Sequence, residues 1–285
     1  INAHTHASVF KGIPIVWNNG KIDQQAGDKG WWFDFSSVTD TGTYYILDKD
    51  KNTKSFNFRI ANNVYADALN AACKMFYYNR CNSEKKTPYA DKRWTDEIDF
   101  TGPNQDSQCH DIADRKNQSK IKDLTGGWWD AGDYNKYVTF LYDVIHPMVS
   151  AYDYNPEAFT DKLNIPESKN GIPDIIDEIV WELKWVSKMR ESDGGVHIKM
   201  GETKQSTSDK PSQSKEERFY GPVCSSSTIV TAGIFAHCAL ILEPFPIYNQ
   251  LREDLQKRAI LAWNWYKNNP KCDSCDNQII RAGDA

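Results

Sequence analysis

The 285-residue sequence has no long apolar run and no excess of basic residues. No stretch approaches the ~18 consecutive apolar residues of a membrane-spanning helix, and none resembles a signal peptide. The 34 lysines and arginines face 39 acidic residues, the formal net charge is −5, and the basic residues form no stripe. These absences argue against a membrane protein and against nucleic acid as a partner.

Aromatic residues and cysteines, in contrast, are well represented. Aromatics make up 13% of the sequence and include ten tryptophans, whose flat rings either stack on sugars or fill a core. Seven cysteines at wide spacings fit an exported protein with one or more disulfides, although an odd number leaves one thiol over. The length allows one large or two smaller domains.

The residue pattern changes from strand-like to helical near residue 60. Residues 1–58 hold short alternating runs that predict three or four strands, too few for a stable two-sheet sandwich. From Asn62 or Asn63, as a cap, a helical period follows, with one face formed by Val64, Ala68, Ala72, Met75 and Phe76. Further helices are expected over 137–152, from Ile172-Pro173 to Val186, over 227–242 and over 250–267, with long polar loops at 82–125 and 191–221. Because no strand is expected between these helices, the pattern favours an all-α domain of packed hairpins.

The most informative stretch is residues 126–137, Gly-Gly-Trp-Trp-Asp-Ala-Gly-Asp-Tyr-Asn-Lys-Tyr. Ala131 and Gly132 allow a tight turn that aims the carboxylates of Asp130 and Asp133 into the same space. Asp133 is expected at or just before a helix start, where free N–H groups and the helix dipole keep a carboxylate ionised, as a general base requires. The structural alternative is an ordinary N-cap at Asp133 and an ordinary turn residue at Asp130.

This stretch resembles the signature of glycoside hydrolase family 9, whose members carry Gly-Gly-Trp-x-Asp-Ala-Gly-Asp-Tyr there. Later segments resemble further parts of that family: 170–174, 177–178, 193–197, 216–219, 226–228 and 281–285. The resemblance implies an (α/α)6 barrel, of which only about the first half, residues 60–285, is present. Phe35-Ser36-Ser37 followed by Gly42-Thr43-Tyr44-Tyr45 resembles the end of the immunoglobulin-like module that precedes some family 9 domains. Residues 1–59 are therefore expected to be the C-terminal part of such a β-sandwich module.

The resemblance also implies roles for individual residues. Asp133 would be the base of an inverting hydrolysis, and Asp130 would help to orient the same water. The substrate-binding residues would be Trp128, Trp129, Tyr134 and His197. The rings of Trp128, Trp129 and Tyr134 would contact glucosyl units, or simply wall the turn, and His197 would lie at the cleft edge or be a structural hydrogen-bonding residue. The acid of the family is a glutamate near the far end of the barrel, which no residue here matches.

Cys81, Cys109 and His110 are the one credible metal constellation. Some relatives with this arrangement hold a structural zinc, completed by a histidine directly before the Asp-Ala-Gly-Asp. Trp129 stands at that position and cannot ligate, which leaves a tetrahedral site incomplete. A Cys81–Cys109 disulfide is an equal alternative. Cys272 and Cys275 favour a loop disulfide or free thiols over zinc, and the acidic loop 202–217 is a source of oxygen ligands for the structural calcium that many relatives use.

The sequence therefore predicts part of an enzyme that hydrolyses β-1,4-glucosidic bonds in cellulose or a related glucan, an endoglucanase of the cellulase type, without an organic cofactor. The alternative is a non-catalytic carbohydrate-binding or assembly module that keeps the cleft. We expect a secreted, cell-surface or periplasmic location. Because the chain begins at Ile1, any export signal has been removed or was not included. Without the remainder of the catalytic domain, this chain alone is expected to be inactive and poorly behaved, with α-helical faces such as Val64 to Met75 exposed.

Overall fold

The computed structural model describes residues 1–204, 208–272 and 280. The chain divides into two compact units, Ile1–Leu69 and Asn70–Ala285, and each is described by itself. The boundary falls within helix α1 (Ala66–Asn79). Among the described residues, no helix is both long enough and apolar enough to cross a bilayer.

The N-terminal unit is built of short strands, as its alternating sequence predicts. All its residues are described, and six strands form three antiparallel two-stranded ladders, β1–β2, β3–β6 and β4–β5. Their bounds are β1 Ile15–Val16, β2 Trp31–Trp32, β3 Gly42–Tyr44, β4 Leu47–Asp48, β5 Thr53–Lys54 and β6 Phe58–Ile60. The strands are more numerous and shorter than predicted, because each pairs over only two or three residues.

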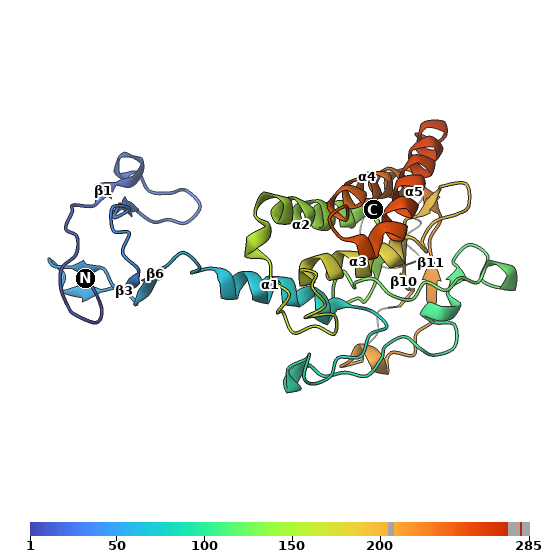
Figure 1. Cartoon of the computed structure of the whole chain (residues 1–285), viewed down its shortest axis with the longest axis horizontal. Coiled ribbons are helices and arrows are strands. Elements are labelled where there is room, and N and C mark those ends of the chain that lie inside the picture. The colour runs from blue at the N-terminus through green and yellow to red at the C-terminus, as the bar shows by residue number, and fades with distance from the viewer. Residues whose placement is uncertain (205–207, 273–279, 281–285) are drawn as a thin grey trace. The chain divides into compact units, whose positions relative to one another are not determined.

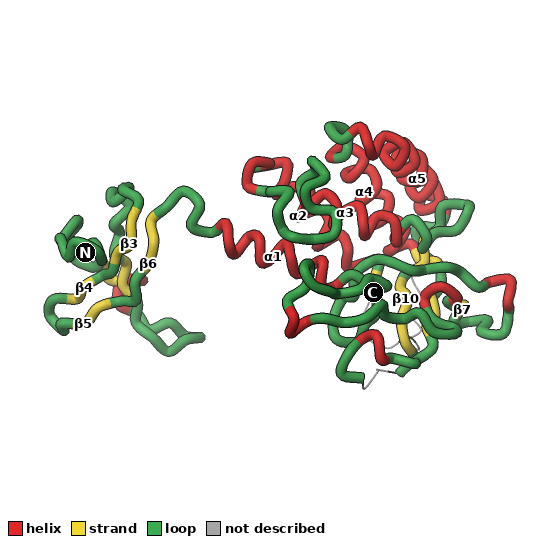
Figure 2. Tube along the Cα trace, turned by 60° about the horizontal axis from the view of Figure 1, so that its bottom comes forward, coloured by secondary structure: helices red, strands yellow, loops and turns green. Residues whose placement is uncertain are grey.

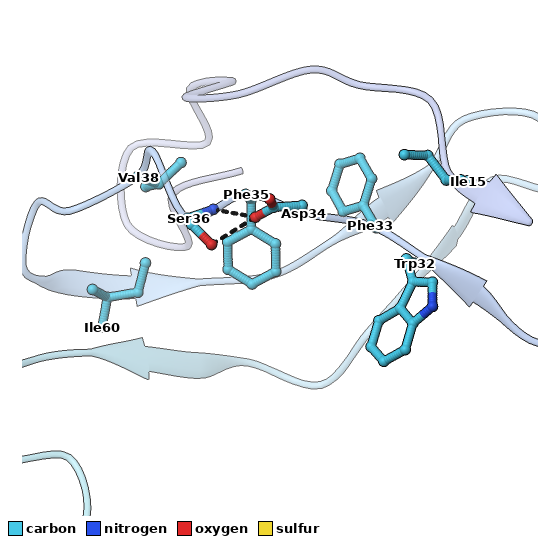
Figure 3. Close-up of a pocket in the computed structure, with 8 residues that line it drawn as sticks. All are labelled: Ile15, Trp32, Phe33, Asp34, Phe35, Ser36, Val38 and Ile60. Carbon is cyan, nitrogen blue, oxygen red and sulfur yellow. Dashed lines mark hydrogen bonds between the residues drawn. The ribbon is translucent and has the colours of Figure 1, made fainter. Parts of the chain in front are cut away.

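The interior of this unit is sparse. Successive aromatic rings touch, from Phe33 to Phe35 to Phe58, with centroids 6.1 and 5.5 Å apart, and Tyr44 is the one large side chain of the unit that is fully buried. An open pocket of about 670 Å³ lies beside Phe33 and Phe35 (Figure 3). Its lining is Ile15, Trp32, Phe33, Asp34, Phe35, Ser36, Val38 and Ile60. None of the candidate catalytic residues lines this pocket.

In its described residues, the second unit contains most of α1, helices α2 to α5 and six short strands. The other helices are α2 Tyr142–Tyr154, α3 Asp174–Val186, α4 Ser225–Ile241 and α5 Asn249–Asn268. The strands are β7 His110–Asp111, β8 Lys136–Tyr137, β9 Val196–His197, β10 Lys199–Glu202, β11 Arg218–Tyr220 and β12 Val223–Cys224. Helices α2 to α5 gather on one side of the unit, and the strands and long loops lie on the other (Figures 1 and 2).

The helix predictions for residues 172–267 are confirmed to within a few residues. Helix α3 starts directly after Pro173, and its predicted inward face, Ile176, Ile179, Val180, Leu183 and Val186, is buried. Pro173 fits there because proline suits a helix start, where its missing N–H costs nothing. Helices α4 and α5 differ from the predicted ranges by at most two residues at each end.

Two expectations about this unit are wrong. The helix predicted from Tyr137 begins at Tyr142, because Lys136 and Tyr137 pair as strand β8 with β10. The expected absence of strands fails for the same reason: β7, β11, β10 and β8 form one sheet in that order, with only the β11–β7 pair parallel. Val64, just before α1, and Met75 of the same predicted face are exposed, as expected for this chain, whereas Cys73 and Tyr77 of α1 are buried.

Candidate active site

Residues 130–135 form a closed turn between two buried segments. The N–H of Asp130 donates to the carbonyl of Asn135 over 2.9 Å, and the N–H of Tyr134 donates to the carbonyl of Ala131 over 3.1 Å. Tyr134 has φ of +55°, an unusual backbone conformation for a residue with a side chain. Asp130 is exposed and Asp133 is half-buried, so both carboxylates lie at the surface of this turn.

Two glycines with positive φ, Gly126 and Gly127, precede the turn in the sequence. A Cβ on Gly127 would lie 2.7 Å from the ring of Trp185, so the chain passes this tryptophan only because no side chain is present. The glycine pair that marks the sequence motif therefore lets the backbone lie against helix α3.

Asp133 does not cap a helix, contrary to expectation, because α2 begins nine residues later at Tyr142. Its hydrogen bonds come instead from the extended segment that follows it. Asn135 donates its backbone N–H to Oδ1 over 3.2 Å and its side-chain Nδ2 to Oδ2 over 3.1 Å. The hydroxyl of Tyr137 donates to the same Oδ2 over 3.1 Å. Three hydrogen-bond donors thus hold the carboxylate in place of the expected helix terminus.

The two carboxyl groups of the turn interact electrostatically. Partial burial and the negative charge of Asp133 raise the pKa of Asp130 above its ordinary value of 3.8. The two carboxyl groups are therefore near enough to interact electrostatically.

A buried ion cluster holds both ends of the turn. Asp106 accepts from Lys136 Nζ over 2.9 Å and from Arg218 Nε over 2.8 Å, and all three side chains are fully buried. Lys136 also donates to the carbonyl of Gly126 over 2.7 Å, and Arg218 donates to the carbonyl of Tyr134 over 2.8 Å. Burial opposes ionisation of Asp106, but the two cations hold its pKa below its ordinary value. The cluster therefore fixes the backbone on both sides of the carboxylates.

Helix α3 supports the turn through two buried carboxyl groups. Glu182 accepts the backbone N–H of Trp128 over 2.7 Å. Glu178 accepts the indole N–H of Trp128 over 3.3 Å and Nε of Arg80 over 3.0 Å. Burial raises the pKa of Glu182 to about 8 and that of Glu178 to about 7. The neutral form of Glu182 is thus favoured near neutral pH, whereas Glu178 pairs with the buried Arg80.

Two of the predicted aromatic residues lie beside the carboxylates. The rings of Trp129 and Tyr134 meet edge to face with centroids 5.3 Å apart, and both approach Phe100, at 6.5 and 5.9 Å. Each is partly exposed, whereas Phe100 is buried behind them. In this geometry the two rings either provide a flat surface for a sugar ring or only pack around the turn.

Trp128 and His197, which the sequence also placed at the substrate, are buried. The Trp128 ring packs on Phe76 with centroids 4.8 Å apart, and only 6% of the residue is exposed. His197 is 5% exposed, and its nitrogens lie 2.8 Å from the carbonyl oxygen of Gly221 and 2.9 Å from Glu191 Oε1. A sugar ring has no access to side chains enclosed in this way, so both positions fit the structural alternatives.

Cys81 and Cys109 do not form the disulfide that was the alternative to a zinc site, so this alternative is wrong. Cys81 and Cys109 are buried free thiols. The Cys81 thiol donates to Asp106 over 3.2 Å and to Asp99 over 3.3 Å, and its pKa is raised well above 9, mainly by burial.

Both ring nitrogens of His110 make contacts elsewhere. Its Nδ1 lies 2.9 Å from the carbonyl oxygen of Arg115, and its Nε2 lies 3.2 Å from Asn104 Oδ1. Across the described ranges, no three His, Cys, Asp or Glu side chains converge to hold a metal ion. This donor set does not fit zinc, which takes cysteine as thiolate and needs a fourth ligand. Cys224 is disulfide-bonded. Cys275, residues 281–285 and residues 205–207 of the expected calcium loop lie outside the described residues.

Sequence reasoning missed Asn135 and Tyr137, the two side chains that contact Asp133. The available signal was their spacing: in an extended segment, residues 133, 135 and 137 share one face. The helix expected from Tyr137 concealed this alternation.

Comparisons with known proteins agree on one family. The family described as Glycosyl hydrolase family 9 matches residues 65–283. Endoglucanase D of Acetivibrio thermocellus is 32% identical over 240 residues, which cover 83% of this chain and 37% of that protein. The xyloglucan-specific endo-beta-1,4-glucanase BoGH9A of Bacteroides ovatus is 30% identical over 84% of this chain and 40% of its own length.

Solved structures give the same result. A structure described as Bacteroides ovatus GH9 has a TM-score of 0.82 at 25% identity, over 95% of this chain and 49% of that one. A metagenome-derived glycoside hydrolase family 9 endoglucanase has a TM-score of 0.73 at 30% identity, over 85% of this chain and 43% of that one. The chain thus spans less than half the length of each of these relatives.

Proposed function

The chain belongs to glycosyl hydrolase family 9, and from this premise we propose that the protein hydrolyses β-1,4-glucosidic bonds in cellulose or a related β-glucan. The names of its relatives, endoglucanase and xyloglucan-specific endo-β-1,4-glucanase, support this substrate class. The family consists of (α/α)6 barrels, and the five described helices fit part of one. The activity of the whole protein is itself part of the proposal, since this chain matches only 37% of endoglucanase D.

Within this chain, Asp133 acts as the general base and Asp130 helps to orient the water that attacks the sugar. The observation that carries this assignment is the closed turn, which sets both carboxylates at the surface while three donors keep Asp133 hydrogen-bonded. Inversion requires the base to stand about 6.5–9.5 Å from the acid so that water fits between base and sugar. Two residues on one six-residue turn are not that pair, so we propose a base and its helper here and no general acid.

Trp129 and Tyr134 supply the aromatic contacts to the glucosyl units beside the cleaved bond. They are the partly exposed rings of the group around the turn, and flat rings with one free face suit the apolar face of a β-linked glucose. Trp128 and His197 are left out because both are enclosed.

The test is to replace Asp133 by Asn in the protein that carries this chain and to assay a soluble β-glucan. Asn keeps the size and the hydrogen-bonding oxygen of Asp but cannot accept the proton, so kcat should fall by roughly 10²–10⁴-fold. Asp130→Asn should cost less, because a helper only orients the water. Asp153→Asn, at an exposed position on α2, serves as the matched control. Near wild-type turnover of Asp133→Asn would rule out Asp133 as the base.

The second candidate function is a carbohydrate-binding or assembly module without catalysis. Two carboxylates that share one turn favour the enzyme, because a pure binder has no need of a positioned water. Binding to insoluble cellulose without release of any sugar by the wild-type protein would favour the binder instead.

For the rest of the protein, we propose that residues 1–59 derive from an immunoglobulin-like module and that the protein is secreted or attached to the cell surface. The antiparallel ladders of the N-terminal unit support the first point, and the polysaccharide substrate class supports the second. Catalysis by two carboxyl groups and water needs no organic cofactor. Calcium, where present, would have a structural part only.

A further inference from the structure

The segment after Asp133 is extended, so its side chains alternate between two faces. Lys136 points into the buried ion cluster with Asp106, whereas Asn135 and Tyr137 both reach Asp133. Only 1% of Asn135 and 3% of Tyr137 is exposed. These two side chains are therefore a built, solvent-protected set of donors behind the carboxylate.

The Asn135 side chain is held at every polar atom. Its Nδ2 donates to Asp133 Oδ2 and to the Tyr137 hydroxyl, each over 3.1 Å. Its Oδ1 accepts the backbone N–H of Glu202 on β10 over 2.9 Å. A Cβ built on Gly201 would lie 1.7 Å from this Oδ1, so the side chain occupies space that any residue other than glycine would fill.

Tyr137 remains a donor throughout the useful pH range. Burial raises the pKa of its phenol well above the ordinary value of 10. Its proton is therefore available to Asp133 Oδ2, which then accepts two side-chain donors, whereas Oδ1 accepts one backbone N–H. Oδ1 is the oxygen with capacity left for another hydrogen bond.

We infer that Asn135 and Tyr137 are positioning residues for the base: together they fix the Asp133 carboxylate and leave Oδ1 as the atom that takes the proton from water. The inference rests on the proposed function of Asp133. Gly201 belongs to the same arrangement, because its lack of a side chain leaves room for the Asn135 side chain to reach both Asp133 and β10.

The first test is Tyr137→Phe, which removes one donor to the charged carboxylate and keeps the ring. The carboxylate then loses one of the donors that hold it, so the acid limb of the kcat/KM profile should move to higher pH. At a pH on that limb, activity should fall about tenfold, with KM little changed. The matched control is Tyr248→Phe, which also removes a tyrosine-to-carboxylate hydrogen bond, from Asp177 Oδ1 at 2.6 Å. Its acid limb should not move.

The second test is Gly201→Ala, which touches neither Asp133 nor Tyr137 directly. The new methyl group must displace the Asn135 side chain, so the acid limb should again move to higher pH. The matched control is Gly233→Ala on α4, where the nearest atom to an added Cβ is His146 Nε2 at 3.5 Å, an ordinary contact. If the Tyr137→Phe variant does not fold, the pH profile of Gly201→Ala alone tests the positioning role.

The outcomes separate this inference from the proposed function. Loss of activity in Asp133→Asn, with unmoved acid limbs in Tyr137→Phe and Gly201→Ala, would overturn the positioning role alone. Lower activity in both variants with an unchanged pH profile would mean that the two residues are merely structural, and would overturn it equally. Full activity of Asp133→Asn would refute the base itself.

Discussion

Glu182→Gln should abolish the pH dependence that this buried carboxyl group imposes on the stability of the protein. Glu182 is fully buried on α3, and its acceptor role toward the Trp128 N–H passes unchanged to the amide oxygen of glutamine. The substitution therefore removes the titrating group while it keeps the hydrogen bond to the segment that precedes the turn of residues 130–135.

The magnitude follows from the pKa of Glu182, which burial raises from 4.5 to about 8. Below pH 4.5 the group is protonated in both the folded and the unfolded chain, so its contribution to stability is fully present. As the pH rises toward 8, the unfolded chain ionises while the folded chain does not, and that contribution is lost. At about 1.4 kcal/mol per pH unit, the loss amounts to about 5 kcal/mol.

The assay is thermal unfolding of wild type and Glu182→Gln between pH 4.5 and pH 8. For a domain of about 200 residues, about 5 kcal/mol corresponds to a shift in Tm on the order of 10–20 °C. The variant should lose less stability than wild type across this range. Glu253→Gln, at an exposed position on α5, is the control and should follow wild type. Parallel curves for Glu182→Gln and wild type would refute the burial argument.

Two further predictions concern buried groups near the turn. Asp106→Asn should destabilise the protein by roughly 3–5 kcal/mol, because Lys136 and Arg218 stay buried without their shared anion; an unchanged melting temperature would contradict this. Purified protein should carry no stoichiometric zinc at Cys81, Cys109 and His110, because Trp129 stands where relatives have the fourth ligand. Metal analysis together with thiol titration tests this, and one zinc per chain with both thiols reduced would show the prediction wrong.

The sequence by itself determined the features that depend on neighbouring residues. The apolar period of residues 172–186 predicted the buried face of α3, since a helix repeats every 3.6 residues wherever it packs. The small residues Ala131 and Gly132 between Asp130 and Asp133 predicted a tight turn, because small side chains leave the backbone free to turn locally.

Only the tertiary structure decided what surrounds that turn. Whether Lys136 and Tyr137 continue a helix or pair as a strand depends on β10, more than sixty residues further along the chain. The enclosure of Trp128 likewise depends on Glu182, 54 residues away, and the ion cluster joins Asp106 to Arg218 across 112 residues. Periodicity and spacing carry no record of such distant partners, since burial and hydrogen bonding arise only when the chain brings them together.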